Sequence, residues 1–237
     1  MIKFLFPLLL IGGLVFWMRL QSQSSGAALR QGSRPLANDQ LEALIGKLAK
    51  AAGVERVDIR VLPETNVNGL ATGTGEIYLT QGLLDVFRSG DVTAREIASV
   101  AAHEMGHLAL GHMKRRMVEV AGRQAAQMIL GSLVARIIPF FGAHVVNWML
   151  NLFTAGLSRR DEFEADAYAT ALMVRSGLGA EHQASMLEKL PALVPGAGQG
   201  ASWLASHPAV EERAQAIREN AARWANSTPQ VEGETPE

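Results

Sequence analysis

Hydrophobic residues in this chain recur mainly at the spacing of helices. Residues 38–52 begin with Asn38, a residue type that caps helix N-termini, and continue with apolar residues every three or four positions. Short apolar runs at residues 57–62 and 75–80 predict strands with turns between them. Helical spacing returns in the later segments, down to a last helix near residues 210–224. The pattern therefore predicts an α+β domain that is mostly helical and has a small β-sheet.

The N-terminus carries an uncharged apolar run over residues 4–18, between Lys3 and Arg19. Its length is at the upper end for the core of a signal peptide and slightly short for a membrane-spanning helix. Snorkelling of the two flanking cations and an interfacial Trp17 can complete a span, so we predict an N-terminal transmembrane helix over residues 1–20. A cleaved signal peptide is the alternative, because small residues follow the run.

Composition divides the rest of the chain into three parts. Residues 21–37 are rich in Ser, Gln and Gly and predict a linker. The folded domain is expected to occupy residues 38–225, and the polar residues 226–237 are expected to form a flexible tail. The net charge of −1 offers no basic field for nucleic acid, and the absence of cysteine excludes disulfides and thiolate ligands.

The chemistry of the chain is carried by His103, Glu104 and His107, which form an H-E-x-x-H motif inside an apolar, alanine-rich stretch. Thr93 and Glu96 form a capping-box pattern that predicts the start of a helix just upstream. Histidines four residues apart project from one face of a helix and can bind one metal ion, while the glutamate reaches the open side of that ion. A zinc site of this kind makes a hydroxide nucleophile at neutral pH. A chance match on a buried histidine pair is the ordinary alternative, but burying these groups without a ligand is costly.

A third ligand is expected from the acidic segment at residues 158–166, where Ser158 predicts the start of a helix. On that helix Glu162 and Asp166 share a face, whereas Glu164 is turned about 200° away. Glu162 can complete a His2Glu site, and Asp166 can hydrogen-bond the far nitrogen of a zinc histidine. An acidic first turn favoured by the helix dipole is the ordinary alternative.

His112 is excluded as the third ligand by helix geometry. It follows His103 by nine residues, so on a continuous helix it lies about 180° around from that histidine and points away from the metal. We expect His112 on the outer face of the helix or near its end.

These motifs resemble those of the HtpX and CAAX-prenyl-protease type of zinc metallopeptidases, gluzincins marked by H-E-x-x-H and then S-R-x-x-E-x-x-A-D. The second pattern is complete in residues 158–166. Residues 68–84 are similar to the family's strand and turn before the active-site helix. Residues 206–213 resemble the family's late H-P-x-x-x-x-R element, with His207 and Arg213 at its ends.

The resemblance covers about residues 38–218 and implies a zincin-like metallopeptidase domain with one zinc ion per chain. The zinc ligands that it implies are His103, His107 and Glu162. Glu104 is then the general base that accepts a proton from the attacking water. His207 is predicted to stabilise the oxyanion, with direct zinc binding in a resting state as the alternative, and Arg213 is predicted to anchor this element by an ion pair.

An exposed strand edge beside the active-site helix can hold an extended peptide by main-chain pairing, which requires no particular substrate sequence. The strand predicted for this role contains Ile77, Tyr78 and Leu79. We therefore predict a membrane-anchored zinc endopeptidase that acts on unfolded or membrane-associated polypeptides in protein quality control. A non-catalytic membrane-anchored chaperone or adaptor and a zinc hydrolase of non-peptide amides or esters are the alternatives.

The catalytic domain is expected outside the cytoplasm, behind an anchor in a bacterial-type inner membrane, or in the periplasm if the anchor is cleaved. The apolar stretch at residues 137–158 is long enough to cross a membrane, but a single crossing there would place Glu162 and His103 on opposite sides of the membrane. Any crossings must therefore be even in number, and charged residues such as Glu119 make the preceding stretch a poor span. We expect residues 118–157 to form two helices packed on the domain, with their apolar face in the core or on the membrane surface.

Overall fold

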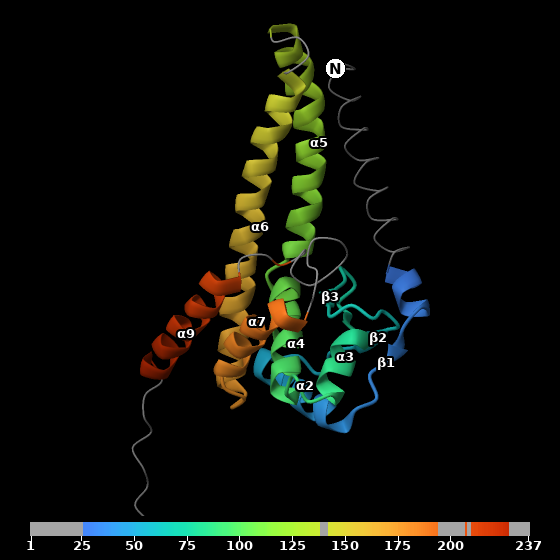
Figure 1. Ribbon diagram of the computed structural model, residues 1–237, viewed down its shortest axis with the longest axis vertical. Coiled ribbons are helices and arrows are strands. Elements are labelled where there is room, and N and C mark those ends of the chain that lie inside the picture. Colours follow the sequence, from blue (N-terminus) through green and yellow to red (C-terminus); the bar gives the residue numbers. More distant parts are fainter. Residues whose placement is uncertain (1–25, 138–141, 194–206, 208–209, 228–237) are drawn as a thin grey trace, which may run out of the picture.

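The computed structural model describes residues 26–137, 142–193, 207 and 210–227. The small sheet lies at one side of the helical part of the domain, and two long helices project from the domain side by side (Figure 1). The elements in chain order are β1 (Arg34–Pro35), α2 (Asp39–Ala52), β2 (Ile59–Leu62), β3 (Gly69–Ala71), β4 (Ile77–Thr80), α3 (Gln81–Arg88), α4 (Ala94–Ala109), α5 (His112–Ile137), α6 (Gly142–Arg175), α7 (Glu181–Leu193) and α9 (Val210–Ser227). The predicted mixture of many helices and a small sheet is confirmed.

The sheet has the strand order β1-β2-β4-β3, with β2 and β4 parallel and the outer strands antiparallel to their neighbours. The strands predicted at residues 57–62 and 75–80 are confirmed as β2 and β4. The strand β3 lies where the sequence predicted turns, and it pairs Gly69 with Leu79 of β4. A strand of three residues is too short for alternation to identify it. This strand packs against α4 at the edge of the sheet.

The prediction that Ile77, Tyr78 and Leu79 bind substrate is wrong. These residues lie in β4, which is hydrogen-bonded to β2 on one side and to β3 on the other, so no edge remains for a peptide. Their side chains are also fully buried. Among the described strands, the edge beside α4 belongs to β3 instead.

The helix α4 begins at the predicted capping box. The Glu96 carboxylate accepts a hydrogen bond from the Thr93 backbone N–H at 2.6 Å, and the Thr93 hydroxyl accepts one from the Glu96 N–H at 3.3 Å. Ser185 and Lys189 of α7 donate to the same buried carboxylate. Burial alone would raise the pKa of Glu96, but these hydrogen bonds lower it to about 2. The N-terminus of α4 is thereby held against α7.

The helices α4 and α6 make a close backbone contact at Gly106. A Cβ atom on Gly106 would lie 2.8 Å from the carbonyl oxygen of Ala165, so a larger residue would push the two helices apart. Ala165 stands between Glu162 and Asp166 in the sequence. The close contact therefore brings both acidic residues to the histidine-bearing face of α4.

The two helices predicted over residues 118–157 are present as α5 and the first half of α6. They were expected to pack on the domain, but they pack on each other and project from it (Figure 1). Large apolar side chains are exposed along them: Val118, Val120, Met128, Ile129, Leu130, Leu133 and Met149. Within the described ranges, no helix combines the length and the apolar character needed to cross a membrane.

The prediction that a helix begins at Ser158 is wrong, because α6 runs without a break from Gly142 to Arg175. The Ser158 hydroxyl accepts a hydrogen bond from Arg116 of α5 at 3.2 Å instead of capping a helix. Packing between the two long helices has overridden the local capping signal. The relative directions of Glu162, Glu164 and Asp166 do not depend on where the helix begins, so the ligand prediction is unaffected.

The ends of the chain are described only in part. The predicted anchor over residues 1–20 lies outside the described residues, as do residues 228–237 of the predicted tail. Of the predicted linker over residues 21–37, the described portion holds a short helix over residues 26–31 and the strand β1, which pairs with β2. This portion is therefore part of the folded domain.

Candidate metal centre

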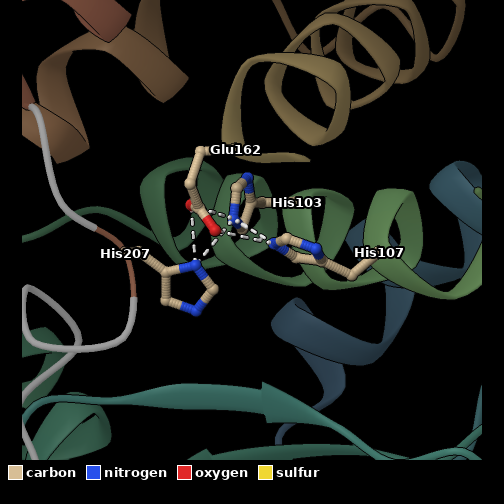
Figure 2. A group of neighbouring side chains, drawn as sticks. All are labelled: His103, His107, Glu162 and His207. Atoms are coloured by element: carbon tan, nitrogen blue, oxygen red, sulfur yellow. Dashed lines mark hydrogen bonds and ion pairs between the residues drawn. The ribbon is translucent and has the colours of Figure 1, made fainter. Parts of the chain in front are cut away.

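Four side chains from three parts of the chain converge on one buried point. His103 and His107 come from α4, Glu162 comes from α6, and His207 precedes α9; Figure 2 shows all four pointing toward one another. One ligand atom from each lies within 4.8 Å of the others. The His103 and His107 Nε2 atoms are 3.0 Å apart, and they lie 3.4 and 3.5 Å from the two oxygens of Glu162. The predicted convergence of the H-E-x-x-H helix with Glu162 is confirmed.

The chemistry of this cluster fits a zinc ion. Three imidazoles and a carboxylate are the ligand types that zinc prefers, and all four residues are buried. Burial alone would lower the pKa of His103, but its hydrogen bonds to Asp166 and Glu162 raise that pKa to about 9. Burial and the charge on His103 lower the pKa of His107 to about 2.

Glu104 lies beside this cluster with an unused carboxylate oxygen. The side chain is buried, and its Oε1 has no hydrogen-bond partner in the part of the chain that the structure describes. His207 Nε2 lies 3.6 Å from that atom. A buried carboxylate oxygen without a hydrogen bond is costly, which fits a position reserved for a water molecule or a substrate proton.

A cleft of about 320 Å³ opens onto the cluster. Gly69, Leu70 and Ala71 of the edge strand β3 form part of its wall, and Glu104 and His207 lie in the same cleft. The strand comes very close to α4, because a Cβ on Gly69 would lie 2.8 Å from Val100 Cγ1. An extended chain in this cleft would thus lie next to the cluster.

A second layer of charged groups holds the cluster in place. Asp166 Oδ1 lies 2.9 Å from His103 Nδ1, which is the hydrogen bond that the sequence predicted. Arg213 is fully buried and donates from Nε to Asp166 Oδ2 at 2.6 Å, while its Nη1 lies 3.0 Å from Glu162 Oε2. Burial would raise the pKa of Asp166, but Arg213 and His103 keep it below its ordinary value. The predicted ion pair of Arg213 is confirmed, and it reaches two carboxylates at once.

His112 was predicted to lie either on the outer face of the helix or near its end. The structure excludes the outer face. Gly111 adopts a φ of +69° and ends α4, so His112 begins α5 and is only 3% exposed. Its Nδ1 lies 2.8 Å from His107 Nδ1. A continuous helix would have pointed His112 outward, but α4 ends before this residue, so the other predicted position, near the end of the helix, is the one observed. Glycine after Leu110 is a typical helix stop signal and could have revealed the turn.

Comparisons with known proteins agree with this site. The model of peptidase family M48 matches residues 35–221. Metalloprotease LoiP of Escherichia coli (strain K12) is 32% identical over 187 residues, which cover 77% of this chain and 71% of LoiP. Metalloprotease YcaL of the same organism is 31% identical over 75% of this chain and 69% of YcaL. Protease HtpX of Psychrobacter sp. (strain PRwf-1) is 26% identical over 85% of this chain and 76% of HtpX.

Proposed function

The chain belongs to peptidase family M48 and is a zinc metallopeptidase, and from this starting point we propose that it is a membrane-anchored endopeptidase for unfolded or membrane-associated polypeptides. The observation that carries the proposal is the convergence of His103, His107 and Glu162 beside the unbonded carboxylate oxygen of Glu104. This is the donor set of a catalytic zinc site with a proton acceptor next to it.

The proposed mechanism assigns the metal to His103, His107, Glu162 and, in the absence of substrate, His207. When bound, zinc supplies a Lewis acid that lowers the pKa of water and polarises a carbonyl group. Glu104 accepts the proton of the attacking water at its free Oε1 and then passes it to the leaving amine. Asp166 keeps the hydrogen of His103 on Nδ1, which leaves Nε2 free to bind the metal.

The edge strand β3 is the proposed binding site for the substrate main chain. One side of this strand pairs with β4, and among the described residues no strand pairs with its other side. Main-chain pairing gives affinity to any extended peptide, whatever its side chains. An unfolded polypeptide offers such a segment more readily than a folded protein does, so this arrangement favours unfolded polypeptides and a role in protein quality control.

His207 is proposed to have two positions in the catalytic cycle. Its Nδ1 lies 2.7 Å from Glu162 Oε2 and 3.4 Å from His103 Nε2, within the set of metal ligand atoms. His207 would therefore be one of the residues that hold the zinc ion when no substrate is bound. We propose that in the presence of substrate the His207 imidazole instead stabilises the oxyanion.

Replacing His207 with alanine is expected to retain about one zinc per chain, because three ligands remain, and to lower kcat by about 10²- to 10³-fold. Metal analysis and steady-state kinetics measure the two effects. His144→Ala, at an exposed histidine of α6, is the matched control and should behave as the wild type. Unchanged or higher kcat in His207→Ala would mean that His207 only blocks the site and has no role in the reaction.

The membrane location is proposed from the sequence. The uncharged run over residues 4–18 is proposed to anchor the chain, with the catalytic domain outside the cytoplasm. The apolar side chains exposed on α5 and α6 support contact between this helical pair and a membrane surface, because exposed patches of this kind mark interaction sites. Such contact would bring membrane-associated substrates within reach of the cleft.

One experiment tests location and activity together. Membranes from cells that produce the full chain are washed at alkaline pH, and both fractions are assayed with unfolded casein. We expect cleavage in the membrane pellet, its loss with a zinc chelator and its return with added zinc, while Glu104→Gln membranes serve as the blank.

The other outcomes identify the alternatives. Activity in the soluble fraction would mean a cleaved or absent anchor. Zinc binding without any cleavage would favour a chaperone or adaptor. Hydrolysis of small esters or amides alone would favour a non-peptide hydrolase.

A further inference from the structure

His112 has no role in the proposed reaction, yet it makes a buried contact with the metal ligand His107. The rings of His107 and His112 have centroids 4.9 Å apart and planes inclined at 72°. The turn at Gly111 places the first residue of α5 back against the last turn of α4. Their two Nδ1 atoms, only 2.8 Å apart, are within hydrogen-bond distance.

The direction of this hydrogen bond follows from the position of the metal cluster. His107 turns its Nε2 toward His103 and Glu162, so Nε2 is the atom that binds a metal and Nδ1 carries the hydrogen. Two ring nitrogens can share a hydrogen bond only if one of them accepts, so His112 Nδ1 must accept. His112 then carries its own hydrogen on Nε2, and the Glu164 Oε2 atom lies 3.3 Å from that nitrogen.

The far end of this chain of hydrogen bonds is held by arginines. Arg160 donates to Glu164 Oε1 at 2.7 Å, and Arg115 contacts both Glu164 and Asp161. A second group of possible metal ligands lies here, because ligand atoms of His112, Asp161 and Glu164 are within 4.8 Å of one another. The guanidinium of Arg115 already supplies the positive charge at that place, which disfavours a divalent cation there.

We propose that His112 is a positioning residue, which orients the zinc ligand His107 through the chain Glu164–His112–His107. It is the counterpart of the chain Arg213–Asp166–His103, which holds the other histidine ligand. Because His112 is the first residue of α5, the chain also connects the metal ligand to the base of the projecting helices. The proposal rests on zinc binding at the site and is independent of the substrate.

Zinc affinity measured by competition with a chelator tests this role without any substrate. His112→Leu retains much of the side-chain volume but removes the acceptor atom Nδ1. We expect this variant to bind zinc about 10- to 100-fold more weakly. His112→Asn keeps an acceptor oxygen near the position of Nδ1, so its loss should be clearly smaller. His144→Leu, at the exposed histidine of α6, is the control and should bind zinc as the wild type does. The melting temperature of each metal-free variant separates an effect on zinc from an effect on folding.

Several results would overturn the proposal. Wild-type zinc affinity in His112→Leu would show that the contact is packing alone, and equal losses in His112→Leu and His112→Asn would show that the acceptor does not matter. Two zinc ions per wild-type chain, with one lost in His112→Leu, would make the second cluster a metal site. If His112→Leu does not fold, the single variants Glu164→Leu and His112→Asn are measured instead. Loss of the Glu164 carboxylate should also weaken zinc binding.

Discussion

Replacing Glu104 with glutamine is expected to leave a folded protein that binds about one zinc per chain and has lost nearly all peptidase activity. Glutamine has the shape of glutamate but cannot accept a proton at neutral pH. General-base catalysis typically contributes about 10²- to 10⁴-fold, so kcat should fall by a factor in that range. Zinc binding should survive because Glu104 is not among the four residues whose ligand atoms converge.

The control for this variant is a carboxylate away from the site. Glu181 is two-thirds exposed and pairs with Arg218 on the surface, so Glu181→Gln should retain full activity and zinc. The wild type, Glu104→Gln and Glu181→Gln are compared by metal analysis for zinc content, circular dichroism for folding and casein cleavage for turnover. Near-normal cleavage by Glu104→Gln would mean that another group accepts the proton.

Replacing Glu162 with alanine is expected to remove both zinc and activity. Glu162 is the only carboxylate in the cluster of four ligand residues, and it supplies two oxygens that face both histidines of α4. Losing a ligand should weaken zinc binding by more than the roughly 10- to 100-fold caused by losing an outer hydrogen-bond partner. Metal analysis after dialysis should therefore find well under one zinc per chain.

Folding must be separated from metal loss in this variant, because Arg213 also pairs with Glu162 in the interior. Arg213 keeps its pair with Asp166 when Glu162 is replaced, so the buried arginine is not left without a partner. Glu162→Gln retains the side-chain volume and provides a second measurement. Full zinc occupancy in both variants would exclude Glu162 as a metal ligand and leave the three histidines to hold the ion.

The local features of the site were predictable because they depend on neighbours along one helix. Four residues separate His103 from His107, and the geometry of a helix alone places them on one face. The capping box at Thr93 and the shared direction of Glu162 and Asp166 follow from the same short-range rules. Each of these predictions holds even though the start of α6 was misplaced by sixteen residues, from Gly142 to Ser158.

Other features could be predicted only by resemblance to known peptidases. Arg213 and Asp166 are 47 residues apart, and no local rule relates them. His207 lies 104 residues from His103, so helix geometry cannot relate the two. The resemblance placed these residues at one site, and the packing of α4, α6 and α9 explains how they meet.

The sequence by itself determined the local part of the metal chemistry, because the helical spacing of His103 and His107 with Glu104 between them favours zinc and a general base. Only the tertiary structure decided which strand has a free edge, since that depends on the order in which four separate segments pair. It also turned His112 inward, through one glycine that ends α4, and joined Arg213 to both Glu162 and Asp166. Such contacts are selected by packing in the whole domain, where the cost of burying each charge is met by partners that lie far away in the sequence.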